Sequence, residues 1–135
     1  MPEGLKPGLT GEAAVLVSDA NTAEMFGNAG AKVYATPMLV ALMEQAAIAA
    51  IRPYLLPGEG SVGTKIEMSH LAATPVGMTV RARAELAEIA GKRLVFEISA
   101  ADGVETVGKC RHERYIVSNM AAFLDKTMGK QIRNA

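Results

Sequence analysis

Three side chains that could take part in acid–base or nucleophilic chemistry lie in or beside apolar segments of this chain. From Met38 to Ile51 only Glu44 and Gln45 are polar, and a carboxylate on a buried helix is costly unless it is paired or hydrogen-bonded. His70 follows in "EMSHLAATP", among small and apolar neighbours. Because histidine is the side chain best suited to proton transfer near neutral pH, it could serve such a carboxylate.

The third residue is Thr36, which lies eight positions before Glu44. Eight residues make about 2.2 helical turns, so the two side chains differ in direction by only about 80° and can flank one cavity. Each residue also has a purely structural interpretation. Thr36 would then be a helix N-cap, Glu44 a carboxylate that reaches solvent or meets an arginine, and His70 a packed histidine. A hydroxyl at a buried helix start can do more, because the free N–H groups there attract a developing oxyanion.

The second histidine, His112, is a weaker candidate. It lies in "KCRHERY", a charged stretch that is more typical of a solvated strand face. The single cysteine, Cys110, is expected to be a small buried hydrophobe rather than a nucleophile. Arginines near this stretch could bind phosphates, although most are expected to be ordinary surface charges. They are Arg81, Arg83, Arg93, Arg111 and Arg114.

A long buried helix is expected to position Glu44. Thr36 is a good N-cap and Pro37 a good first helical residue, and a helix that is apolar nearly all round is a buried one. The prolines and glycines of "RPYLLPGEG" (52–60) end it. Residues 20–33 before it read as a short helical turn followed by a glycine-containing loop.

Most of the remaining chain is expected to form β-strands. Apolar and polar residues alternate in 78–90 and in 93–102, which is typical of half-exposed antiparallel strands. The turns "GK" (91–92) and "DG" (102–103) connect strands, and the full set of expected strands is 12–19, 61–72, 78–90, 93–102 and 104–117. The fold class is therefore α+β, with a curved antiparallel sheet wrapped around the long helix. Open sheet edges favour pairing with a second copy.

Length and composition set the remaining expectations. The 135 residues suit one domain, 1–135, with 1–11 as an extended arm and 127–135 as a frayed tail after a short helix. Fourteen basic residues balance fourteen acidic ones, which argues against nucleic acid as a partner. A single cysteine fits a reducing compartment. With no run of about 18 apolar residues and no signal-peptide pattern, we expect a cytoplasmic protein without a membrane span.

Three stretches of the chain resemble the fluoroacetyl-coenzyme A thioesterase family, within the hotdog-fold thioesterases. They are "ATPMLVALMEQAA", "SVGTKIEMSHLAATPVGMTV" and "HER", which stand in this order at family-like spacing. The resemblance covers about residues 12–125. It implies thioester hydrolysis with a Thr, a Glu and a His, without metal or cofactor, in a homodimer whose sites lie at the subunit interface.

By motif, the resemblance assigns catalytic roles to Thr36, Glu44 and His70. It assigns a glycine near the thioester to Gly63 of "SVGT", and a substrate contact to Arg114 of "HER". Whether Thr36 or Glu44 becomes acylated, or water attacks directly, stays open at this point.

The resemblance fails in one stretch. The fluoroacetyl-specific enzyme has phenylalanines in a lid ahead of the threonine, whereas "EMFGNAGAKVYAT" holds one phenylalanine, Phe26, with glycines and alanines where further aromatic bulk would be expected. We therefore expect a thioesterase that acts on a different, short acyl-coenzyme A. Two alternatives are a hydratase or dehydratase of acyl thioesters on the same fold and a non-catalytic acyl-coenzyme A binding protein.

Overall fold

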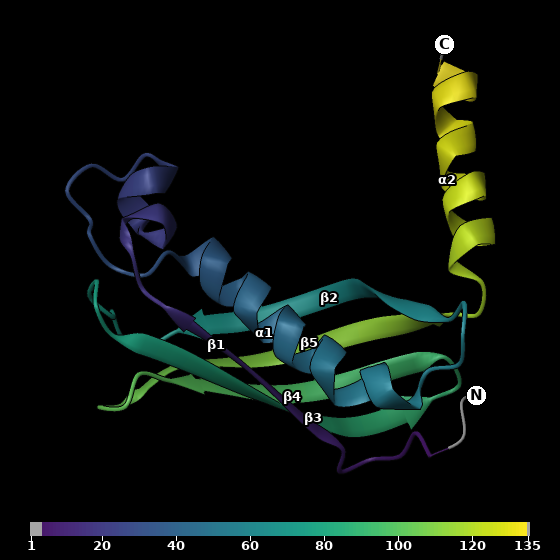
Figure 1. Ribbon diagram of the computed structural model, residues 1–135, viewed down its shortest axis with the longest axis horizontal. Helices are drawn as coiled ribbons and strands as arrows, with labels where there is room; N and C mark the ends of the chain where they lie inside the picture. Colours follow the sequence, from purple (N-terminus) through teal and green to yellow (C-terminus); the bar gives the residue numbers. More distant parts are fainter. Residues whose placement is uncertain (1–3, 135) are drawn as a thin grey trace.

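The computed structural model describes residues 4–134, which form one antiparallel sheet with a long helix, α1 (Thr36–Ile51), against one face (Figure 1). The strand order across the sheet is β1-β3-β4-β5-β2. The strands are β1 (Thr10–Leu16), β2 (Gly60–His70), β3 (Thr79–Ala90), β4 (Arg93–Ala101) and β5 (Thr106–Val117). This confirms the α+β class and the curved sheet around a buried helix.

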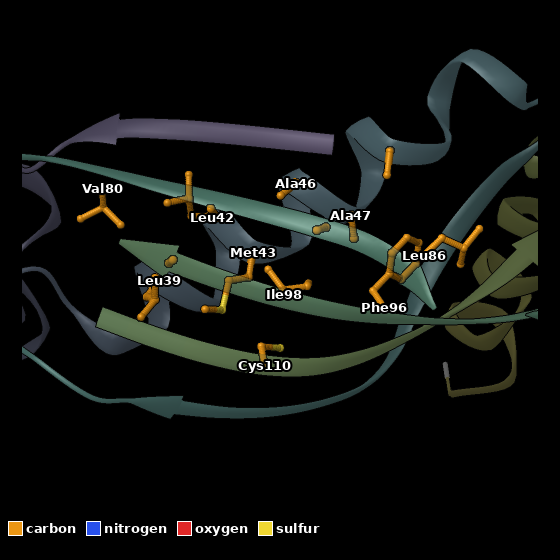
Figure 2. Packing of buried hydrophobic residues seen from close by; sticks show 14 of the residues in the cluster. Leu39, Leu42, Met43, Ala46, Ala47, Val80, Leu86, Phe96, Ile98 and Cys110 are labelled. Atoms are coloured by element: carbon orange, nitrogen blue, oxygen red, sulfur yellow. The ribbon is translucent and has the colours of Figure 1, made fainter. Parts of the chain in front are cut away.

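The core lies between α1 and the inner face of the sheet, as Figure 2 shows. The alternation expected for β3 is confirmed, because every second side chain from Val80 to Leu86 is fully buried. In β4 the expected face is also buried, with Phe96 as its largest side chain, but Val95 between two of these residues is buried as well. On the helix, Ala46 and Ala47 are also fully buried. Small side chains at these positions let the helix backbone lie close to the sheet, so Leu, Ile and Val of the strands fill the core without tryptophan.

Helix and sheet approach each other closely at Gly11 of β1. A Cβ built on Gly11 would lie against the backbone of α1, 2.5 Å from the carbonyl oxygen of Ala46 and still closer to the amide nitrogen of Ala50. Because backbone atoms cannot rotate aside, only glycine lets β1 pack here.

We expect Gly11→Ala to lower the free energy of unfolding by about 1–3 kcal/mol, the usual cost of overpacking a core. Denaturant unfolding monitored by circular dichroism measures the change. Ala14→Val is the matched control, since Ala14 is exposed on the other face of the same strand and should change stability by about 0.5 kcal/mol or less. Equal stability of Gly11→Ala and wild type would contradict this packing.

Two boundaries differ from the expectations. α1 has Ala35 as its N-cap, so Thr36 is the first helical residue and not the cap. The C-terminal helix α2 (Met120–Asn134) is longer than the expected short helix, and it includes the described part of the expected frayed tail. Residues 1–3 of the expected arm and residue 135 of that tail lie outside the described residues.

Short 3-10 helices complete the chain. η1 (Asp19–Asn21) and η2 (Ala23–Phe26) fill the segment where a helical turn was expected, and η3 (Arg52–Tyr54) follows α1. No helix within residues 4–134 is both long enough and apolar enough to cross a membrane.

β2 is an edge strand of eleven residues. One of its sides pairs with β5, from Gly60 opposite Val117 to His70 opposite Gly108. Among the described strands, none pairs with the other side. β2 thus offers a row of free backbone N–H and C=O groups to a second strand.

Candidate active site

Thr36 and His70 meet where the start of α1 faces the end of β2. The Thr36 Oγ1 atom lies 2.8 Å from Nδ1 of His70, at hydrogen-bond distance. Both residues line a cavity of about 360 Å³, together with Tyr34 and Leu71. A hydroxyl hydrogen-bonded to an imidazole is the arrangement in which a base can activate a nucleophile.

The first turn of α1 explains why this hydroxyl is available. The backbone carbonyl of Ala35 accepts the N–H groups of Met38 and Leu39, so the helix begins without a side-chain cap. Thr36 therefore points its oxygen at His70 and not back at the helix. The positive end of the helix dipole lies at the same place and favours negative charge that develops on a bound substrate.

His70 is held in a form suited to accept a proton. Burial lowers the pKa of the His70 imidazole, and the nearby backbone of Ala72 only partly opposes this effect. Its second ring nitrogen, Nε2, is buried and has no hydrogen-bond partner among the described residues. Since buried polar atoms are almost always paired in a complete assembly, this nitrogen fits a group supplied by substrate or by another subunit.

Glu44 lies in a different cluster, built from α1, β2 and β5. An NH1 group of Arg114 donates a hydrogen bond of 3.2 Å to Oε2 of Glu44, and a second of 3.2 Å to Nε2 of His112. The Nδ1–H of His112 is then free to donate to the carbonyl of Lys65, 2.8 Å away. Arg114 also contacts the side chain and carbonyl of Ser61. This network fixes the direction of the Glu44 carboxylate, whose side chain remains 39% exposed.

Gly63 makes room for that carboxylate. A Cβ built on Gly63 would lie 2.7 Å from Oε2 of Glu44 and 3.3 Å from the His112 ring. Glu44, Gly63 and His112 line a second cavity, of about 280 Å³. The glycine that the family resemblance places near the thioester is thus required here because the carboxylate occupies the space of a side chain.

The expected catalytic set is therefore divided between two clusters of one protomer. Thr36 is with His70, whereas Glu44 is with Gly63 and Arg114. Eight residues of α1 separate Thr36 from Glu44 by about 12 Å along the helix. Seven residues of β2 separate Gly63 from His70 by roughly 20 Å. A single protomer does not bring His70 to Glu44.

His112 was missed as a site residue, and the expectation of a solvated strand face is wrong for it. The residue is only 1% exposed, because β5 turns His112 and Arg114 toward α1 and Arg111 toward solvent. The alternation of "CRHERYI" carries this signal: every second residue faces the same side. The inward-facing positions were not recognised because a histidine and an arginine occupy them, where apolar residues are usual.

Arg114 is also separated from the arginines with which it was expected to bind phosphates. It is buried on the inner face, whereas Arg83 and Arg111 line a hollow of about 530 Å³ on the outer face. There Arg111 pairs with Glu97 and Glu88. This larger hollow is lined mainly by charges of both signs and lies on the far side of the sheet from Thr36 and Glu44, so we do not assign the chemistry to it.

The interpretation of Cys110 as a small hydrophobe is confirmed. Its side chain is buried, and burial raises the pKa of the thiol to about 11. The thiol is therefore protonated near neutral pH and is a poor nucleophile.

The two histidines make stability depend on pH. Burial lowers the pKa of His112 and of His70 in the folded chain, so the unfolded chain binds their protons more readily. We therefore expect the free energy of unfolding to fall as the pH drops below about 6.5. Denaturant unfolding at several pH values between 5 and 8 measures this slope.

Single variants identify the residue responsible. His112→Asn and His70→Asn should each flatten the slope, and the double variant should flatten it further. A wild-type stability that rises on acidification from pH 7 to pH 5.5 would contradict the lowered pKa of both imidazoles.

The comparison with known families decides the relationship. The model of a family described as FlK, fluoroacetyl-CoA-specific thioesterase, matches residues 17–120. The chain belongs to the fluoroacetyl-CoA-specific thioesterase family. The matched residues include Thr36, Glu44, Gly63, His70 and Arg114, whereas nearly all of α2 lies beyond the match.

Individual relatives agree with this membership. A fluoroacetyl-CoA thioesterase of Streptantibioticus cattleyicolor is 50% identical over 86 residues, which cover 64% of this chain and 62% of that protein. The match thus spans less than two thirds of the relative. A solved structure of the fluoroacetyl-CoA thioesterase FlK is 38% identical, has a TM-score of 0.86 and covers 95% of this chain and 98% of its own.

The fold itself is the hotdog fold that the resemblance implied. A hot-dog-like protein from Thermanaerovibrio acidaminovorans, 24% identical, superposes with a TM-score of 0.83 over 94% of this chain and 93% of its own. The sheet of this member of the fluoroacetyl-CoA-specific thioesterase family surrounds α1 as expected for that fold.

Proposed function

We propose that this chain hydrolyses a short acyl-CoA thioester to the free acid and coenzyme A. The observation that supports it best is the Thr36–His70 pair, 2.8 Å apart beside a cavity of about 360 Å³. As Oγ1 of Thr36 attacks the acyl carbon, His70 takes its proton and returns it to the departing thiolate. Water then cleaves the acyl-threonine ester and regenerates the hydroxyl.

Glu44 enters this scheme through a homodimer. We propose that two copies pair along their free β2 edges around a twofold axis. Antiparallel pairing places the His70 end of one strand beside the Gly63 end of the other. The partner's Glu44 would then stand near Thr36 and His70, with its carboxylate held by the partner's Arg114. That carboxylate is suited to take the proton of the hydrolytic water.

The dimer also accounts for features that a single protomer leaves incomplete. The free edge of β2 would be covered. The buried Nε2 of His70, which has no partner among the described residues, would face a substrate held between two subunits. Light scattering at micromolar concentration should give the mass of a dimer.

We propose that the enzyme acts on a short acyl group and does not prefer a fluorinated one. Phe26 is more than half exposed, and Gly27 and Gly30 adopt positive φ angles of 94° and 82° in the loop that follows it. Tyr34 is thus the aromatic residue of this segment that lines the cavity at Thr36, and Phe26 does not line it. Fluoroacetyl-CoA and acetyl-CoA should therefore be hydrolysed with similar efficiency.

A thiol-release screen over short acyl-CoA thioesters tests the proposal, with Thr36→Ala as the control protein. We expect thiol release by wild type from acetyl-CoA or a close homologue. Loss of an enoyl-CoA without thiol release would indicate a hydratase. Tight binding without turnover of any thioester would indicate a binding protein.

A further inference from the structure

α2 projects from the body of the protein and leaves an apolar stripe uncovered (Figure 1). Phe123, Leu124, Met128 and Ile132 are between 39% and 81% exposed, and the last three repeat every four residues, as on one face of a helix. The base of the helix is anchored, because the amide of Met120 donates to the carbonyl of Gly58. A free fifteen-residue helix with such a stripe is marginal in water, so its stripe calls for a partner surface.

A second projection stands at the opposite end of β2. The segment 19–35, which contains η1 and η2, rises past the same edge of the sheet as α2 does (Figure 1). It exposes Met25 and Phe26, and Leu71 is exposed at the end of β2. Part of this segment, with Leu71, lines the cavity that holds Thr36 and His70.

The proposed twofold pairing along β2 would bring these two projections together. Half a turn about an axis through the middle of β2 would place each α2 beside the partner's segment 19–35. Their charges are complementary. α2 carries Lys126, Lys130 and Arg133 against one carboxylate, Asp125. The segment 19–35 carries two acidic residues, Asp19 and Glu24, against one basic residue, Lys32.

We infer that α2 packs its apolar stripe on the partner's Met25 and Phe26, and that it closes the outer wall of the acyl cavity at the partner's Thr36 and His70. The occupant of this helix face is thus a second copy of the chain. The inference rests on the proposed β2-paired dimer and adds a specificity element to it. Nearly all of α2 lies beyond the residues that the family model matches.

Photo-crosslinking tests the contact directly. A benzoyl-phenylalanine replaces Met128 on the stripe or, as control, Lys126, which points to the opposite side of the helix. Dimers are formed from equal amounts of the probe-bearing chain and ¹⁵N-labelled wild type. After irradiation, mass spectrometry of the crosslinked peptides identifies both the site and the subunit of attachment.

We expect the probe at position 128 to attach to residues 19–35 or 71–76 of the labelled subunit, and the probe at 126 to give little of this product. Light scattering on the same samples shows whether a missing crosslink reflects a wrong placement of α2 or the absence of the β2 dimer. A dimer without the inter-subunit crosslink overturns the placement of α2 and leaves the β2 dimer intact. A monomer overturns both.

A charged substitution in the apolar stripe of α2 tests whether the helix affects catalysis. Met128→Glu should lower kcat/KM about tenfold or more, because a charge buried in an interface weakens the wall of the cavity. Gly129→Glu adds the same charge at the next position, which points away from Leu124 and Met128, and should have little effect. Equal kinetics of the two variants, with folding verified by circular dichroism, would contradict a role for α2 at the site.

Discussion

Replacing His70 with alanine should lower kcat by about 100-fold or more, the usual effect of removing a positioned proton-transfer group. Thr36→Ala should cost a similar factor, since the hydroxyl and the imidazole lie 2.8 Å apart and act on one proton. If they work as a unit, the double variant should lose little more than either single variant. Thiol release from the best substrate measures all three rates.

The pH profile offers an independent check on the same pair. Burial lowers the pKa of His70, and the imidazole must be neutral to accept a proton. The acid limb of kcat/KM for wild type should therefore lie below about pH 6.5. Circular dichroism verifies the fold of each variant. A folded His70→Ala protein that turns over within a few-fold of wild type would show that His70 is only a packed histidine.

Mixing two inactive variants should restore activity. His70→Ala and Glu44→Gln each inactivate every site of their own dimer. In a mixed dimer, one site combines intact His70 from one subunit with intact Glu44 from the other. Random exchange makes half of the dimers mixed, each with one good site of two, so about a quarter of wild-type activity should return.

The control is a mixture of His70→Ala with Thr36→Ala. Because Thr36 and His70 lie in the same protomer, both sites of that mixed dimer stay defective and no activity should return. Unfolding and refolding the chains together ensures exchange. If His70→Ala and Glu44→Gln fail to complement after proven exchange, the assignment of Glu44 to the partner's site is wrong.

Local patterns in the sequence were sufficient to predict the main helix and the strands. A run with only two polar residues between Met38 and Ile51 predicts a buried helix, because no face of it can meet water. Alternation in 78–90 and 93–102 predicts strands with one buried face, since the side-chain period of a strand is two. The types of Thr36, Glu44 and His70, together with the family resemblance, predicted the residues that could do chemistry.

Only the tertiary structure decided which of these residues meet. Thr36 joins His70 because α1 starts where β2 ends, and Glu44 joins Arg114 and His112 because β5 pairs with β2 and turns both side chains inward. These contacts depend on strand order and register between residues up to 70 positions apart. A sequence pattern is local, so it specifies which face a side chain takes along its own strand but not which distant strand lies beside it.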